Sequence, residues 1–153
     1  MNSIQSMNRA ADNIRILAAS MVEKAKSGHP GGAMGGADFI NVLYSEYLQF
    51  DPQNPTWMGR DRFFLDPGHM SPMLYAQLAL IGKFSMEELQ QFRQWGSPTP
   101  GHPEVCYERG IENSSGPLGQ GHAYAVGAAI AAKFLSARTG NPTFEHETIY
   151  AYI

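Results

Sequence analysis

The chain has 153 residues, of which 43% are hydrophobic and 16% charged, and its formal net charge is -3. This length and composition predict one folded globular unit and exclude a disordered segment. The acidic balance, without a run of Lys or Arg, favours small-molecule chemistry over a nucleic-acid or anionic-membrane partner. The single cysteine cannot form an internal disulfide, and no signal peptide is recognisable. No apolar run approaches the roughly 20 residues of a membrane helix. For these reasons we expect a cytoplasmic protein.

Two helices are predicted in the first third of the chain. From Met7 to Ala25, apolar residues recur at intervals of three and four, which is typical of one buried helical face. A second helix is expected from Ala37 onward. It should end before the Asp51-Pro52 pair, because proline disfavours helical backbone in the preceding residue.

The middle of the chain predicts a strand, a turn and two further helices. The run Arg62–Leu65 is a short strand, followed by a glycine turn and a helix with Ser71 as its N-cap. Ser85 and Glu88 form a capping box for the next helix. A long loop rich in glycine and proline follows, and such loops are usually functional or disordered.

The last third predicts a helix and a strand. The motif GPLGQG, residues 116–121, opens a helix rich in Ala and Gly that should stop at Gly140. The β-prone run Ile149–Ile153 predicts a strand buried on both faces of a parallel sheet. The expected fold class is therefore α/β, a parallel sheet flanked by helices, and because the chain ends on such a strand we interpret it as a fragment that is incomplete at its C-terminus.

Four of the five histidines directly follow a glycine, which suggests a polar site built on loops. They are His29, His69, His102 and His122. Glycine lets the backbone approach a ligand closely, and histidine changes charge near neutral pH. Metal ligation by the first three is the weaker hypothesis, because their neighbours lack the ligand spacing of a zinc site.

Two further motifs have both a structural and a functional interpretation. GPLGQG is either a helix-entry turn or a backbone cradle that offers amides to a flat or anionic ligand at a helix N-terminus. It does not follow the G-x-G-x-x-G order of a dinucleotide site. The cluster Arg60, Asp61 and Arg62 more often makes salt bridges than a phosphate site.

Together these motifs resemble the N-terminal module of the transketolase family. KSGHPGGAMGGAD, RDRFFLDPGHMS, FRQWGSPTPGHPE and IENSSGPLGQGHAYAVG occur in the order and approximate spacing of that family. The resemblance extends over nearly the whole chain, and its specificity lies in the joint occurrence of SGHPG, TPGHPE and GPLGQG. The related deoxyxylulose-phosphate synthases differ at the last two motifs.

The resemblance implies a thiamine-diphosphate enzyme of the pentose phosphate pathway that moves a two-carbon ketol unit between sugar phosphates. In that case His29 assists proton transfers at the substrate, His69 lies by the diphosphate and the reaction centre, and His102 binds the ketol hydroxyl. Residues 116–118, which are Gly116, Pro117 and Leu118, line the cofactor. Residues 1–153 correspond to the first part of the diphosphate-binding domain, and the complete protein is expected to be a homodimer.

This chain departs from the family pattern around Asp66-Pro67, which replaces the more usual short polar lead-in, and at His122, whose position is often apolar. In the family a Gly-Asp-Gly follows the last strand and supplies a ligand of the Mg²⁺ that grips the diphosphate. We therefore expect the ligands of this metal ion to lie beyond Ile153 and none of them to lie within the chain. The isolated fragment is expected to be inactive.

Other interpretations remain open at this point. Within the same chemistry, the protein could be a dihydroxyacetone synthase or one subunit of a split transketolase. From a different class, it could be a non-catalytic binding or assembly module with the Ala/Gly helix as its contact surface.

Overall fold

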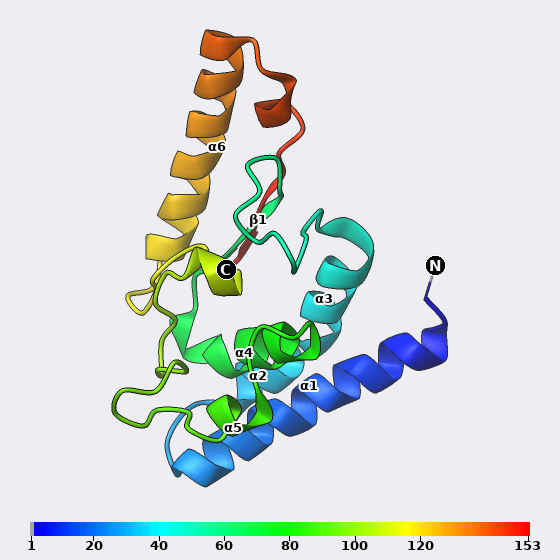
Figure 1. Cartoon of the computed structure of the whole chain (residues 1–153). Helices are drawn as coiled ribbons and strands as arrows, with labels where there is room; N and C mark the ends of the chain where they lie inside the picture. The colour runs from blue at the N-terminus through cyan, green and yellow to red at the C-terminus, as the bar shows by residue number, and fades with distance from the viewer. Residues whose placement is uncertain (1) are drawn as a thin grey trace.

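A two-stranded parallel sheet separates two groups of helices in the computed structural model, which describes residues 2–153 (Figure 1). The sheet consists of β1 and β2, and the elements in chain order are α1 (Ile4–Ala25), α2 (Pro30–Gly35), α3 (Ala37–Val42), the π-helical turn Leu43–Tyr47, β1 (Arg62–Leu65), the 3-10 turn Gly68–Met70, α4 (Ser71–Leu80), α5 (Met86–Leu89), the 3-10 turn Tyr107–Arg109, α6 (Gln120–Thr139), the 3-10 turn Pro142–Phe144 and β2 (Ile149–Tyr152). The α/β class expected from the sequence is confirmed.

Helix α1 is the long helix predicted from the apolar spacing, and it begins three residues earlier than expected. Ser3 caps it by accepting a hydrogen bond from the backbone N–H of Ser6. Its buried face includes Ile14, Ala18 and Met21, which belong to a core shared with α3 and α4. The amphipathic pattern therefore predicted both the helix and the side that is buried.

The segment SGHPGGAMGG contains helix α2, which the sequence did not predict. Pro30 occupies its first turn, where a fixed φ favours the helix and the missing N–H costs nothing. The glycines suit close packing, because a Cβ added at Gly32 would lie 2.9 Å from the sulfur of Met70. Helix α3 begins at Ala37 as predicted, but it passes into the π-helical turn at Leu43 and ends well before Asp51.

Strand β1 has the predicted bounds, whereas the start of α4 differs in detail. Met70 is the N-cap of α4, and the predicted N-cap, Ser71, instead donates its hydroxyl to the carbonyl of Gly101 at 2.8 Å. The prediction of Ser71 as N-cap was therefore wrong. The capping box of Ser85 and Glu88 is present, although α5 ends at Leu89.

Strand β2 pairs with β1 in parallel, with Arg62 opposite Ile149 and Leu65 opposite Tyr152. Its residues are only partly buried, so the prediction of a strand buried on both faces was wrong for the described residues. The physical reason is that β1 covers one edge of β2 while its other edge has no strand within residues 2–153.

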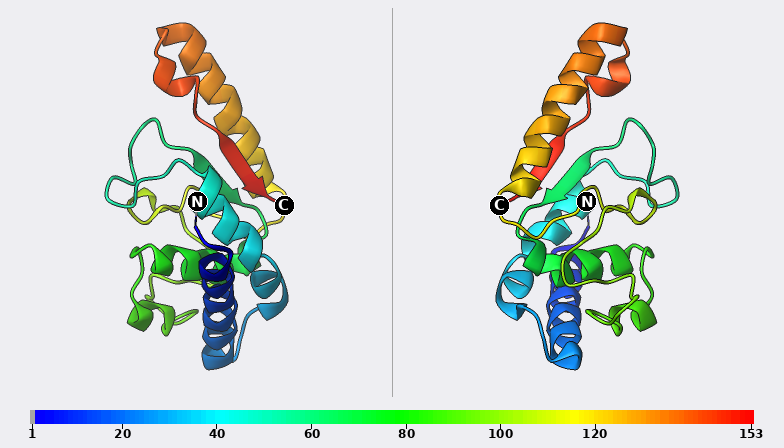
Figure 2. Two further views of the ribbon diagram at one scale, coloured as in Figure 1. Left: turned by 90° about the vertical axis from the view of Figure 1, so that its right-hand side faces the viewer. Right: turned by 90° about the vertical axis from the view of Figure 1, so that its left-hand side faces the viewer.

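Side chains of β1 alternate between the two helical layers. Phe63 and Leu65 join the core formed with α1, α3 and α4, whereas Phe64 lines a cavity beside α6. Helix α6 therefore covers the opposite face of the sheet and lies beside β2 (Figure 2). This arrangement directs the start of α6 toward the carboxyl end of β1.

Helix α6 ends at the predicted Gly140, which adopts φ 64° as its C-cap. Its buried residues are all small, namely Gly121, Ala125 and Ala132, so its backbone packs close to the sheet. None of the helices within residues 2–153 is long and apolar enough to span a membrane.

Candidate functional site

Two of the Gly-His loops meet directly at the carboxyl end of β1. His69 lies in the 3-10 turn that follows β1, and His29 is the N-cap of α2. Their ring centroids are 5.0 Å apart with an interplanar angle of 62°, an edge-to-face contact. The topology therefore brings together two histidines that are 40 positions apart in the printed sequence.

The third loop places His102 beside the GPLGQG motif. A Cβ added at Gly116 would lie 3.6 Å from Cγ of His102. Helix α4 anchors this loop from beneath, because the buried Tyr75 donates its hydroxyl to the carbonyl of Pro100 at 2.9 Å. His102 itself stays exposed, so the anchored backbone presents its imidazole to solvent.

The histidines influence one another electrostatically. Burial lowers the pKa of His69 below its ordinary value of 6.5, and the nearby charges of His29 and His102 lower that pKa further. An imidazole with a lowered pKa is neutral at pH 7 and can accept a proton. The arrangement therefore suits proton transfer near neutral pH.

Glycine is required at the first loop by its backbone conformation. Gly28 has φ 127°, a region that other residues rarely adopt, and an added Cβ would lie 3.2 Å from both Phe92 and Val22. Arg93 donates to the hydroxyl of Ser27 at 2.7 Å and ties this loop to the chain after α5. These contacts fix the backbone just before His29.

The loop after β1 packs directly against the segment before α6. A Cβ added at Gly68 would lie 2.8 Å from Oγ of Ser115 and 2.9 Å from the backbone nitrogen of Gly116. Because that approach is closer than a real Cβ allows, a glycine is needed here. Ser115 Oγ is buried and has no hydrogen-bond partner among the described residues, which leaves one polar group available within the site.

The GPLGQG turn presents backbone and an apolar side chain rather than free amides. Gly119 is the N-cap of α6 with φ 95°, and the N–H groups of Gly119 and His122 both donate to the carboxylate of Asp66. The backbone N–H groups that could bind an anion at this helix start therefore already bind the carboxylate of Asp66. Leu118, within the turn, is 70% exposed, which favours a flat, partly apolar ligand.

The site fits an aromatic, cofactor-sized ligand by the chemistry of its groups. It combines three imidazoles, the exposed Leu118, the bare backbone of Gly116 and the unpartnered hydroxyl of Ser115. Within residues 2–153, no group of three or more His, Cys, Asp or Glu side chains is placed to hold a metal ion.

Two cavities differ in their relation to this site. One of about 490 Å³ lies between α6 and the loop of residues 105–114, and none of the predicted site residues line it. A second, of about 680 Å³, is lined by His102, Arg93 and Ser27 and opens beside the histidines. The second cavity is therefore the one that adjoins the candidate site, because the imidazole of His102 forms part of its wall.

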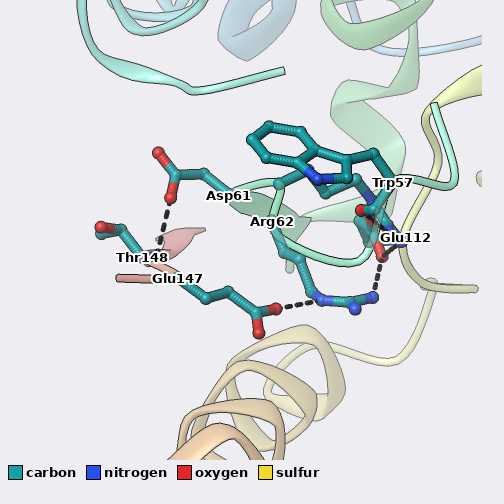
Figure 3. Close-up of polar contacts among 7 residues, drawn as sticks. Trp57, Asp61, Arg62, Glu112, Glu147 and Thr148 are labelled. Atoms are coloured by element: carbon teal, nitrogen blue, oxygen red, sulfur yellow. Dashed lines mark hydrogen bonds and ion pairs between the residues drawn. The ribbon is translucent and has the colours of Figure 1, made fainter. Parts of the chain in front are cut away.

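The opposite, amino end of β1 carries a network of ion pairs (Figure 3). Arg60 binds Glu112 through two hydrogen bonds of 2.8 and 3.2 Å, and Arg62 bridges Glu112 and Glu147. Burial alone would lower the pKa of Arg62, but its two carboxylate partners raise the pKa overall. The interpretation of this cluster as salt bridges is confirmed for Arg60 and Arg62.

From the sequence the role of Asp66 was missed, and Asp66 was noted only as part of a departure from the family pattern. An acidic residue directly after a strand, in a chain with a glycine-rich helix entry elsewhere, is a signal that could have indicated it. Glu112 and Glu147 were missed as well. Their pairing with the arginines of β1 depends on a tertiary contact that no local pattern contains.

Comparison with known proteins places this geometry in a family. Residues 6–153 match the family model described as "Transketolase, thiamine diphosphate binding domain". Transketolase-1, chloroplastic, from Arabidopsis thaliana is 51% identical over 148 residues, which is 95% of this chain and 20% of the relative. Transketolase 1 from Escherichia coli K12 is 50% identical over 150 residues, which is 97% of this chain and 23% of the relative.

Solved structures agree with these sequence matches. Transketolase from Leishmania mexicana has a TM-score of 0.85 and 43% identity, and the match covers 99% of this chain and 22% of that one. The complex of Pichia stipitis transketolase with sedoheptulose-7-phosphate has a TM-score of 0.86 and 40% identity, covering 95% and 22%. The chain thus spans about a fifth of the length of its relatives. Since the model of the thiamine diphosphate binding domain matches nearly all of its residues, the chain belongs to the transketolase family.

Proposed function

We propose that the complete protein is a transketolase that transfers a two-carbon ketol unit from a ketose phosphate to an aldose phosphate in the pentose phosphate pathway. The observation that carries this proposal is the convergence of His29, His69 and His102 at the carboxyl end of β1. Relatives named transketolase, one of them solved with a sugar phosphate, support it. The chain would be the first part of the diphosphate-binding domain.

Thiamine diphosphate is the proposed cofactor, together with Mg²⁺ or another divalent cation. When bound, the cofactor supplies a nucleophilic carbon and an electron sink. Gly116, Pro117 and Leu118 would hold it through exposed backbone and an apolar contact, with His69 close to it. The cation ligands are proposed to lie beyond Ile153.

The three histidines divide the proton chemistry in this proposal. Forming and cleaving a carbon–carbon bond beside hydroxyls requires protons to be removed and returned, which positioned imidazoles do near pH 7. His29 would transfer protons at substrate oxygens, and His102 would hydrogen-bond the ketol hydroxyl. The neutral form of His69, which its lowered pKa favours, would accept a proton at the reaction centre.

A homodimer in the cytoplasm is the proposed state of the complete protein. Val126, Ile130 and Phe134 follow one another at four-residue intervals along α6, and all three are largely exposed. An apolar stripe of this kind is typical of a surface that another element covers. The same stripe is what favours the alternative function, a non-catalytic assembly module.

The decisive experiment compares the complete protein with residues 1–153 alone. Purified complete protein should transfer ketol units between sugar phosphates only when thiamine diphosphate and a divalent cation are present, and the 153-residue chain should show no turnover. Transfer that is independent of the cofactor would refute the proposal. Turnover by the 153-residue chain would refute the expectation that this chain is inactive on its own.

The remaining alternatives are separated by simple observations. A dihydroxyacetone synthase would be recognised by the range of acceptors that the complete protein uses. A split transketolase would have its other half encoded by a separate gene. An assembly module would keep its function when the histidines are replaced and lose it when Ile130 is replaced by aspartate.

A further inference from the structure

The start of α6 is capped by a side chain that is distant in sequence. The first N–H groups of a helix have no partner within the helix and are usually satisfied by a side chain at the N-cap. The N-cap of α6 is Gly119, which has no side chain to offer. Asp66 takes this role from 53 residues away, with its two carboxylate oxygens 2.8 and 2.9 Å from the nitrogen of Gly119.

A third hydrogen bond and close packing complete this contact. The N–H of His122, in the first turn of α6, donates to Asp66 Oδ1 at 3.2 Å. A Cβ added at Gly121 would lie 2.5 Å from Cα of Asp66, so the helix backbone rests directly on the residue that caps it. A carboxylate in this position is also stabilised by the helix dipole.

The electrostatics show that Asp66 acts as an anion. Burial would raise the pKa of Asp66, but the N–H groups of Gly119, His122 and Gly121 and the charge of His122 outweigh it and lower the pKa overall. Asp66 is 4% exposed, so its carboxylate is directed at these donors rather than at solvent.

This clamp lies next to the segment that lines the proposed cofactor site. Gly119 has φ 95°, and glycine alone imposes little restraint on the backbone. Leu118, directly before Gly119, is 70% exposed, so burial of its side chain does little to fix the turn. The packing of Gly68 against Ser115 and Gly116 fixes the beginning of the turn, and the hydrogen bonds of Asp66 hold its backbone at Gly119.

We propose that Asp66 is a positioning residue for the cofactor: it holds the turn of residues 116–119 and the first turn of α6 against the carboxyl end of β1 before the cofactor binds. The effect on binding is indirect, through the backbone of Gly119 and His122. The inference rests on the proposed function, because it assumes that thiamine diphosphate binds at this turn.

A matched control exists at the other end of the same strand. Asp61 is 3% exposed and likewise accepts hydrogen bonds from two backbone N–H groups, those of Gln49 at 2.9 Å and Thr148 at 2.7 Å. It caps backbone as Asp66 does, but at the amino end of β1. A purely structural effect of losing a buried carboxylate should therefore appear in both variants.

The test compares Asp66→Asn with Asp61→Asn in the complete protein. Calorimetry would measure the dissociation constant of thiamine diphosphate in the presence of Mg²⁺, and thermal unfolding would measure the stability of each variant. Because hydrogen bonds to a charged group are lost, we expect Asp66→Asn to weaken cofactor binding at least about tenfold relative to Asp61→Asn. At saturating cofactor, kcat should change much less than the dissociation constant.

Three outcomes would overturn the inference. Equal affinities in the two variants would reduce Asp66 to a structural residue. Tighter binding in Asp66→Asn would mean that its charge merely repels the diphosphate. Fast hydrogen exchange at the amides of Gly119 and His122 in the cofactor-free wild type would show that the turn is not held in advance.

Two further arrangements keep the test informative. If Asp66→Asn does not fold, Asp66→Ser takes its place with Asp61→Ser as its control, and weaker cofactor binding than in that control is again expected. If the wild-type protein does not bind thiamine diphosphate at all, the proposed function fails. A wild type that binds the cofactor while Asp66→Asn binds it equally well rejects the positioning role alone.

Discussion

The two ends of strand β1 differ in whether their charged and titratable side chains already have partners, although a buried aspartate caps backbone N–H groups at each end. At the amino end, Arg60 and Arg62 bind Glu112 and Glu147, and every one of these charges meets an opposite charge. At the carboxyl end, Asp66 meets backbone N–H groups, and the imidazoles of His29 and His102 beside it remain exposed. One end is closed and complete, whereas the other keeps polar groups available to a ligand.

This difference separates stability from function along a single strand. Groups that already have partners contribute to folding and have little left to offer a substrate. Exposed imidazoles contribute little to folding, so their presence on anchored glycine loops is explained better by chemistry. Substitutions at the two ends should therefore have opposite effects on activity and on stability.

The largest expected effect is on the reaction rate at the carboxyl end. In the complete protein, His102→Ala should lower kcat about 10²- to 10³-fold, the usual range when one hydrogen-bond donor to a reacting oxygen is lost. Steady-state kinetics with saturating sugar phosphates would measure it. Since His102 is exposed, the temperature of unfolding should not change.

The control for this variant is His146→Ala, which replaces an exposed histidine near the amino end of β2. It should retain the wild-type rate. A wild-type rate in His102→Ala would remove that residue from the site, whereas a loss of rate in both variants would indicate a general effect of removing imidazoles.

The second effect concerns stability at the amino end. Glu112→Gln removes the carboxylate shared by two arginines, and breaking a buried ion pair costs about 3–5 kcal/mol of unfolding free energy. Urea unfolding would measure this loss. The kcat of the folded variant should stay near the wild-type value.

An exposed pair provides the comparison for Glu112. Asp12 binds Arg15 on the surface of α1, with 67% of its side chain exposed, so Asp12→Asn should cost less than about 0.5 kcal/mol. If Glu112→Gln lowered kcat strongly while leaving stability intact, the division between the two ends of β1 would be wrong.

The third prediction uses two glycines of the same helix. Gly121→Ala places a Cβ 2.5 Å from the Cα of Asp66, so the helix start must move, at a cost of about 1–3 kcal/mol. Gly127 has no atom within 4 Å of an added Cβ, so Gly127→Ala should stabilise the helix by about 1 kcal/mol. Denaturant unfolding of both variants checks the sign. Equal effects would contradict the close docking of α6 on Asp66.

The smallest effect concerns pH. Burial and the charges of His29 and His102 lower the pKa of His69 below 6.5, so the unfolded chain binds more protons between the two pKa values. The contribution of His69 to stability is present above pH 6.5 and is lost as pH falls through its folded pKa. The urea midpoint should therefore drop less between about pH 7.5 and about pH 5.5 in His69→Gln than in wild type. A titration by NMR that gave His69 a pKa above 6.5 would contradict this prediction.

Local patterns predicted most of the elements but few of the contacts between them. The three-four spacing of α1 and the β-prone run of β1 depend on neighbouring residues, so both were recognised. Helix α2 was missed because its glycines disfavour a helix locally, and the packing of Gly32 against Met70 is a tertiary contact that no local pattern contains. Ser71 was misassigned for a similar reason, since its hydroxyl is used by the distant Gly101.

The candidate site was predicted from the Gly-His pairs, but its internal geometry was not. Sequence alone could indicate that His29, His69 and His102 lie on loops, whereas the contact between two of the rings depends on how α2 packs beside the end of β1. The capping role of Asp66 was missed because the helix start that it caps lies 53 positions away in the sequence. The catalytic and cofactor-binding roles of these residues stay predictions until the variants are measured.

The pairing of β1 with β2 has a consequence for how the molecule folds. The hydrogen bond from Thr148 to Asp61 joins residues 87 positions apart, so closing the crossover is a costly loss of chain entropy. Contacts with such a separation form late and slow the overall rate. The helical layer around α1 and α4 can assemble from nearer contacts first, and the sheet would then be the last part of this chain to acquire its native order.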